Sequence, residues 1–167
     1  MTSAWHRATE LPPTIQNQLR QLLTSAEFLL KQSTKKLNES SRIVGAITIH
    51  IKYATALQEN GQKEEAEIFL KEAALMTIQA RQKERQASFL VQFADKAIDD
   101  AKIKLRAALM IQEEQINSET EKLVMGVINV IFAEVREETE NRPIWRIPPR
   151  GGMTMQSPPP PYEGGNM

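Results

Sequence analysis

The sequence lacks cysteine altogether, and residues 14–142 contain no proline. Without cysteine there is no disulfide, no thiol nucleophile and no cysteine-ligated zinc site. Aromatic residues make up only 5% of the 167 residues. No apolar run reaches the roughly 18 residues that indicate a membrane span. Lys and Arg number 21 and balance 21 Asp and Glu, so the basic excess typical of nucleic-acid binders is missing and we expect no nucleic-acid partner.

The distribution of proline and glycine divides the chain into parts. Residues 14–142 hold only three glycines, and they are rich in residues with high helix propensity. The last 25 residues hold seven prolines and four glycines, a composition that buries too little apolar surface to order a chain. We therefore predict an all-α fold, with long antiparallel helices in a hairpin or bundle. Its parts are a flexible N-terminus (1–10), a helical body (11–142) and a disordered Pro/Gly-rich tail (143–167).

The first half of the body carries one apolar stripe. From Ile15 to Leu57 the apolar residues are mostly three, four or seven positions apart, as on one face of a helix. The polar cluster from Lys35 to Ser41 leaves two alternatives open, one long helix or two. Asn60-Gly61 is typical of a helix end. Acidic residues directly after it indicate a new helix, so we predict a hairpin with a tight turn over residues 41–80.

The region of this turn has small residues where two helices would cross. They lie in the pattern Tyr53, Ala54, Ala56, Leu57, Gly61, Ala66, Leu70 and Ala73. The pattern resembles a tetratricopeptide-type hairpin, and the run at 73–76 recurs at 107–110, an offset that equals the 34-residue period of that repeat. The resemblance implies stacked helical repeats. The alternative, two helices with alanine-rich packing faces, stays open because the rest of the unit does not recur.

The body ends in an apolar run. Residues 82–116 continue as helix, and Ser118-x-x-Glu121 is a capping box that predicts the start of a last helix. Its run 123–133 is open to three interpretations: the centre of a bundle, a face for a second copy or helical partner, or a weak membrane-surface contact. The acidic stretch after it disfavours anionic lipid. The candidate self-association face consists of Leu123, Val124, Val127, Ile128 and Ile131.

Charge is unevenly placed along the neutral chain. Residues 14–60 carry a net charge of +3, and residues 117–142 carry −3. The two segments are expected to attract each other, either within one bundle or head to tail between chains.

The residues of common active sites do not come together in the sequence. His6 lies in the predicted flexible start, and His50 has no second histidine on its helix, whereas a metal site needs several converging ligands. Neighbouring glutamates such as Glu64 and Glu65 point to different sides of a helix. No phosphate-binding glycine loop or nucleophile elbow is present. We therefore expect a protein that is not an enzyme and holds no metal or cofactor.

The tail contains the most informative motif. Pro159-Pro160-Pro161-Tyr162 is a P-P-x-Y sequence that follows another proline. Consecutive prolines hold a polyproline II helix before any partner arrives, and WW domains read such segments in an aromatic-lined groove. Ser157 and Tyr162 are candidate phosphorylation sites. Phosphate on the tyrosine is expected to oppose its entry into an apolar pocket.

The motif resembles the PY motifs of adaptors that recruit HECT-type ubiquitin ligases. It is also similar to the late domains with which viral matrix and Gag-like proteins reach the ESCRT budding machinery. The resemblance implies that Pro159 and Pro160 fill the groove and that Tyr162 fills the adjoining pocket. It covers only residues 158–162.

The function that follows is a non-enzymatic helical adaptor or scaffold that recruits a WW-domain protein. Two alternatives stay open: a viral structural protein, matrix- or capsid-associated, and a regulatory subunit of an enzyme. The first ten residues hold no apolar stretch typical of a signal peptide, and cysteine is absent. The expected compartment is therefore the cytosol or the nucleus.

Overall fold

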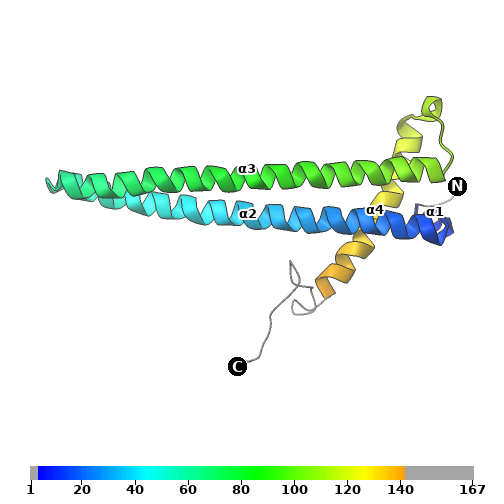
Figure 1. The fold of residues 1–167 in the computed structure, drawn as a ribbon, viewed down its shortest axis with the longest axis horizontal. Coiled ribbons are helices and arrows are strands. Elements are labelled where there is room, and N and C mark those ends of the chain that lie inside the picture. Colours follow the sequence, from blue (N-terminus) through cyan, green and yellow to red (C-terminus); the bar gives the residue numbers. More distant parts are fainter. Residues whose placement is uncertain (1–3, 142–167) are drawn as a thin grey trace, which may run out of the picture. The chain divides into compact units, whose positions relative to one another are not determined.

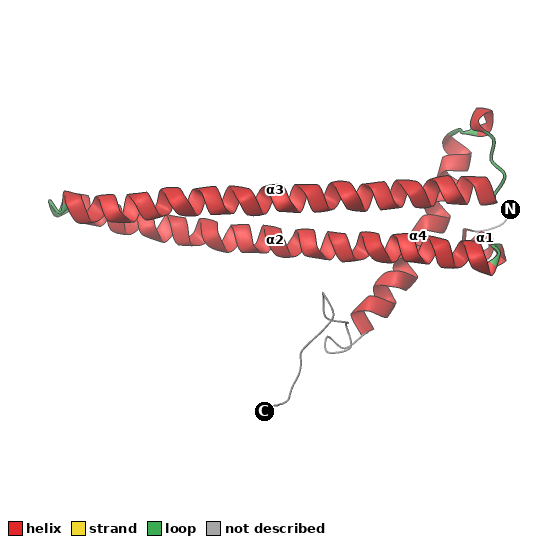
Figure 2. Ribbon diagram, viewed as in Figure 1, coloured by secondary structure: helices red, strands yellow, loops and turns green. Residues whose placement is uncertain are grey.

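The computed structural model describes residues 4–141, and all of its regular structure is helical (Figures 1 and 2). The helices are α1 (Ala4–Glu10), α2 (Pro13–Glu59), α3 (Lys63–Ala108) and α4 (Ser118–Asn141), with a short 3₁₀ turn at Glu113–Gln115 before α4. The prediction of an all-α fold with long antiparallel helices is confirmed. The chain divides into two compact units, Met1–Phe132 and Ala133–Met167, and the division falls within α4.

Helices α2 and α3 lie side by side as an antiparallel hairpin (Figure 1). They contain 47 and 46 residues, so each arm is about 70 Å long at the rise of an α-helix. Of the two alternatives for the polar cluster from Lys35 to Ser41, the structure shows one continuous helix. Each arm is longer than a whole tetratricopeptide repeat, so the structure shows two long helices with alanine-rich packing faces.

The tight turn lies where the sequence predicts it. α2 ends at Glu59, and Gly61 adopts a φ of +78°, the left-handed conformation that favours glycine. The N–H of Gln62 donates to the carbonyl of Leu57 over 2.8 Å, which closes the end of the helix. α3 then begins at Lys63 with Glu64 and Glu65 in its first turn, where the helix dipole favours acids.

The two arms meet along small residues that repeat every seven positions. In α3 the buried residues are almost all alanines, at positions Ala66, Ala73, Ala80, Ala87, Ala94 and Ala101. In α2 the matching buried row is Leu19, Ala26, Ser33, Ser40 and Ala54. A strict seven-residue period keeps such a contact row facing the partner along two supercoiled helices. We call these two rows the hairpin interface.

Two serines show how closely the arms approach. The hydroxyl of Ser33 donates to the carbonyl of Ala87 over 3.1 Å, and that of Ser40 donates to the carbonyl of Ala80 over 3.2 Å. A side chain of one carbon reaches the backbone of the opposite helix only when no larger side chain separates the helices. The alanines are therefore required for the close approach, and each buried hydroxyl is satisfied.

Helix α1 packs on α4 at a glycine. A Cβ placed on Gly126 would lie 2.9 Å from the Cβ of Ala4, so the two helices meet where Gly126 has no side chain. Ala8 and Leu11 are also buried. The interpretation of residues 1–10 as flexible did not include this helix. Its seven residues carry too short a pattern to predict a helix, and packing supplies the stabilisation that so short a helix lacks by itself.

Helix α4 begins where expected, but its cap is Asn117 rather than the predicted Ser118. The side-chain oxygen of Asn117 accepts the N–H groups of Glu119 and Thr120, over 2.9 and 3.0 Å. In return, the Asn117 N–H donates to the Thr120 hydroxyl over 2.9 Å, which completes a reciprocal box one position earlier. The Glu121 carboxylate is thereby free for another partner.

Candidate functional site

The predicted WW-binding motif and the candidate phosphorylation sites lie outside the described residues. This holds for Ser157 and for Pro159, Pro160, Pro161 and Tyr162, so their roles stay predictions from the sequence.

The apolar run of α4 is used for burial within one chain. Val124 and Val127 are fully buried, Ile128 and Ile131 are nearly so, and Leu123 is half-buried. The first interpretation of this run, the interior of a helical assembly, is thus what one chain shows. Its use as a face for a second copy or another helix stays a prediction.

Arg106 joins the end of α3 to the start of α4. Its guanidinium donates two hydrogen bonds to one carboxylate oxygen of Glu121, over 2.7 and 3.0 Å, and a third to the other oxygen over 2.9 Å. Such a forked pair fixes the orientation of both side chains and is stronger than a single contact. Because Glu121 is not used in the helix cap, this pair fixes the geometry of the connection between α3 and α4.

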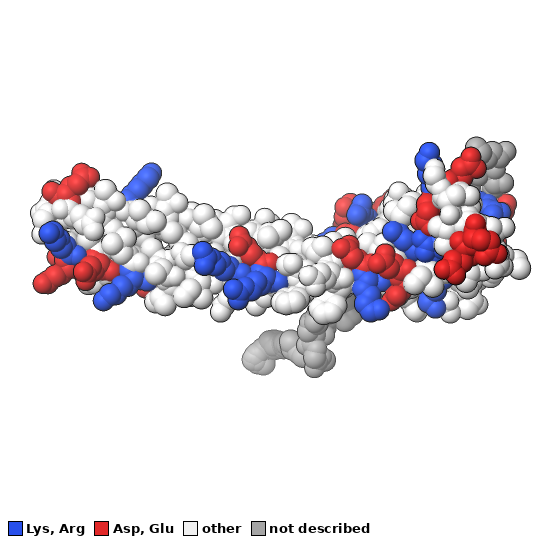
Figure 3. Space-filling view, turned by 90° about the horizontal axis from the view of Figure 1, so that it is seen from above, with Lys and Arg blue, Asp and Glu red and all other residues white. Residues whose placement is uncertain are grey.

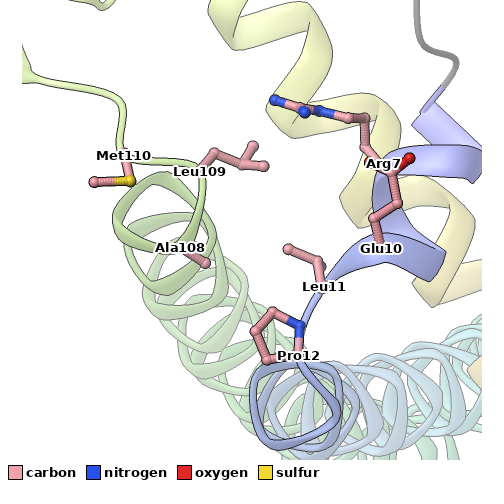
Figure 4. A pocket seen from close by; sticks show the side chains of 7 residues that line it. All are labelled: Arg7, Glu10, Leu11, Pro12, Ala108, Leu109 and Met110. Atoms are coloured by element: carbon pink, nitrogen blue, oxygen red, sulfur yellow. The ribbon is translucent and has the colours of Figure 1, made fainter.

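A small pocket of about 210 Å³ lies beside this end of the hairpin (Figure 4). Its walls are Arg7, Glu10, Leu11, Pro12, Ala108, Leu109 and Met110. Met110 has a φ of 60° where the chain leaves α3, and it is exposed. The pocket is smaller than the roughly 300 to 1,000 Å³ of most small-molecule sites, and only one guanidinium and one carboxylate line it. This arrangement indicates incomplete packing of a helix end rather than a ligand site.

His50 belongs to an aromatic cluster near the turn of the hairpin. Its Nδ1 atom lies 2.9 Å from the carbonyl oxygen of Ala46, and its ring makes an edge-type contact with Phe69, with 5.6 Å between the centroids. Tyr53 stacks on Phe69, with 5.8 Å between the centroids. Within residues 4–141 no three His, Asp or Glu side chains converge as a metal site would need. His50 therefore has a packing role in the structure.

Glu39 is the one described carboxylate whose pKa departs clearly from its usual value. The ammonium of Lys83 on α3 lies 3.0 Å from its Oε1 atom, and that of Lys36 lies 3.8 Å away. The hydrogen bond from Lys83 is the main cause of a lowered pKa for Glu39; partial desolvation opposes it, and the neighbouring lysines add to it. These contacts tie the middles of the two arms together.

Many large apolar side chains of the hairpin remain exposed. On α2 they include Leu37, Val44 and Ile51, whose exposed fractions are 48%, 49% and 46%. On α3 Ile68 and Phe89 are exposed by 67% and 58%. In the view of Figure 3 the charged side chains gather in clusters, and uncharged surface separates them. Contiguous exposed apolar surface, rather than single exposed side chains, is what marks binding sites for other proteins.

The sequence interpretation recognised only part of the hairpin interface. It placed Ala54, Ala66 and Ala73 where two helices cross near the turn, but it did not follow the row of alanines at a spacing of seven along the rest of α3. The signal that predicts this interface is the uninterrupted alanine at every seventh position from Ala66 to Ala101.

Comparison of the chain with protein-family models, with curated proteins and with solved structures finds no match. What the structure defines is a class of architecture, a long antiparallel α-hairpin with two further helices. In the described part of the chain, no helix has both the length and the apolar character that crossing a membrane requires.

Proposed function

We propose that this chain is a non-enzymatic helical scaffold that recruits a WW-domain protein, for example a HECT-type ubiquitin ligase, through Pro159 to Tyr162. The observation that carries the proposal is the motif itself. Four consecutive prolines precede Tyr162, so the peptide is held near its bound conformation before binding. Little conformational entropy remains to be lost, and a short contact then suffices for useful affinity. The proposal places the protein in the cytosol or nucleus.

The hairpin supports this proposal because it is a framework that can carry the motif of the tail. Its two arms are joined along their length by the hairpin interface and by the Glu39–Lys83 pair. Such a framework needs no partner to bury its alanine row. Its exposed aliphatic side chains offer surface for a further protein. A scaffold needs these two properties, a surface for assembly and a separate recognition peptide.

The experiment is an isothermal calorimetric titration of the full chain with an isolated WW domain. We expect Tyr162→Ala to weaken binding at least tenfold, because the tyrosine is the side chain expected to fill the pocket beside the groove. The matched control is Tyr53→Ala, which removes the only other tyrosine, a residue of α2 that is 59% exposed. The control is expected to bind as the unaltered chain does.

Two results contradict the proposal. One is equal affinity of the unaltered chain and Tyr162→Ala for every WW domain tested. The other is absence of binding by both chains at concentrations of several hundred micromolar.

A further inference from the structure

A second face of α2 repeats the seven-residue pattern of the hairpin interface, and seven of its eight residues are exposed. Its residues follow two rows, aliphatic at Leu30, Leu37, Val44 and Ile51, and hydroxyl-bearing at Thr34, Ser41, Thr48 and Thr55. Thr34, Ser41 and Thr55 directly follow positions of the hairpin interface, and Thr48 follows Ile47, which has the same seven-residue spacing. Each hydroxyl residue therefore points about 100° away from α3. We call these eight residues the outer α2 face.

The outer α2 face is uncharged, and its threonine hydroxyls are already satisfied. Thr34, Thr48 and Thr55 donate to the carbonyls four residues earlier, over 3.1, 3.2 and 2.9 Å. These hydrogen bonds remain when water is removed from the face. Burial there consequently removes methyl and methylene groups from water without leaving these donors unpaired.

Gly45 lies beside this face, and the chain itself gives no reason for a glycine there. The residue is exposed in the middle of α2, and a Cβ built on it would have no atom within 4 Å. Glycine inside a helix costs about 1 kcal/mol relative to alanine. An external backbone that approaches α2 closely would account for the missing side chain.

We infer that the outer α2 face binds a second copy of this chain, with the two α2 helices antiparallel about a two-fold axis at Val44–Gly45. The pattern is complementary to itself in this arrangement. About this axis Ser41 of one copy comes opposite Thr48 of the other, Thr34 comes opposite Thr55, and Leu37 lies within one residue of the position opposite Ile51. A two-fold interface requires such a match, because one patch must fit its own copy.

The charges beside the face select the antiparallel direction. Lys31 and Glu59 lie equally far from Gly45 on its two sides, and both are exposed. About the axis between Val44 and Gly45, each Lys31 lies within one residue of the position opposite Glu59 of the other copy. In a parallel two-fold pair the row that holds Lys31 and Glu59 would lie beside the uncharged aliphatic row of the other copy, so this ion pair would not form.

This inference deepens the scaffold part of the proposed function and rests on that function only for its use in the cell. The motif at Pro159–Tyr162 takes no part in the pairing. A chain that dimerises without binding WW domains contradicts the proposed function alone, and a chain that binds WW domains as a monomer contradicts this inference alone.

Sedimentation equilibrium of the full chain tests the dimer. We expect a mass of twice 18.9 kDa at tens of micromolar, and a monomer for Val44→Glu, which places two carboxylates at the axis. The matched control is Ile68→Glu, a similar change at an exposed site on α3, which is expected to remain dimeric. Circular dichroism checks that both variants keep their helices. A monomeric unaltered chain, or a dimer that survives Val44→Glu, overturns the inference.

Disulfide trapping tests the direction, and the absence of native cysteine makes it simple. We expect Ser41→Cys and Thr48→Cys chains to cross-link when mixed under mild oxidation, and neither to cross-link efficiently alone. Efficient cross-linking of each chain with itself indicates a parallel pair and overturns the inference. Lys31→Glu and Glu59→Lys are each expected to weaken the dimer, and the double variant to restore it. A double variant as weak as the single ones removes the assigned charge pairing and overturns the register.

Discussion

At the scale of single residues, the places that matter most are those where a side chain is missing or very short. Gly126 lets α1 approach α4, Gly61 allows the turn, and Ser33 and Ser40 reach across to the backbone of α3. Each position has a different physical requirement. At Gly126 the neighbouring helix leaves no space for a side chain, and at Gly61 the backbone is in the left-handed conformation. Ser33 and Ser40 must be short enough to let the helices approach and must carry a hydroxyl that donates to α3.

We predict that Gly126→Ala destabilises the folded chain. The added methyl would lie 2.9 Å from the Cβ of Ala4, so α1 must shift away from α4. Overpacking of this kind costs about 1 to 3 kcal/mol, measured by urea denaturation. The control is Asn129→Ala on the same helix, where the side chain is exposed. Unchanged stability of Gly126→Ala would show that Ala4 does not pack there.

We predict that the stability contribution of Glu39 depends on pH. Its pKa in the folded chain is lowered, so the contribution is present above the ordinary carboxyl pKa of 4.5 and is lost as the pH falls through the lowered value. Glu39→Gln should therefore melt below the unaltered chain at pH 7, and the two should converge at a pH below the lowered pKa of Glu39. The same melting difference at both pH values contradicts the role of the Lys83 contact.

At the scale of elements, the hairpin depends on the spacing of its alanines. The row in α3 has alanine at every seventh position, and the facing row in α2 also consists of small residues over most of its length. The stabilisation comes from many close contacts between backbones rather than from large side chains. A single enlarged side chain in the row therefore affects the approach of both helices.

We predict that Ala87→Leu destabilises the hairpin by about 1 to 3 kcal/mol, because it separates the arms and breaks the hydrogen bond from Ser33. Ala74→Leu is the matched control, since that alanine is exposed on the same helix. Urea denaturation followed by circular dichroism measures both. Equal stability of the two variants contradicts the hairpin interface.

The elements were predictable to different degrees. The turn at Gly61 and the start of α4 follow from local signals, and both lie where the sequence predicts them. The continuity of α2 through Lys35 to Ser41 could not be predicted from local signals, because that stretch is mostly polar and shows no apolar stripe. In the structure Ser40 is buried against α3, and Glu39 pairs with Lys83, so polar residues make contacts that local patterns do not show.

At the scale of the whole molecule, the formal charge is zero, yet the charge is not uniform. A basic α2 and an acidic end of α4 belong to one chain, and uncharged surface lies between the charged clusters of the hairpin in the view of Figure 3. The WW-domain titration and the sedimentation experiment address two separate surfaces, so each can fail without the other.

The candidate sites divide in the same way. The motif ending at Tyr162 was found from sequence because its residues are adjacent in the chain. The outer α2 face was not found from the sequence. Its eight residues can be recognised as one face only when the hairpin interface shows which side of α2 is buried against α3.

The sequence by itself determined the helical class and the turn, and it contains the P-P-x-Y motif, because composition, glycine conformation and consecutive prolines act within a few residues. Only the tertiary structure decided which helix faces are buried. Alanines and serines carry little apolar surface and so leave a weak signal along the chain. They become the core of the hairpin because two helices approach closely only where side chains are small.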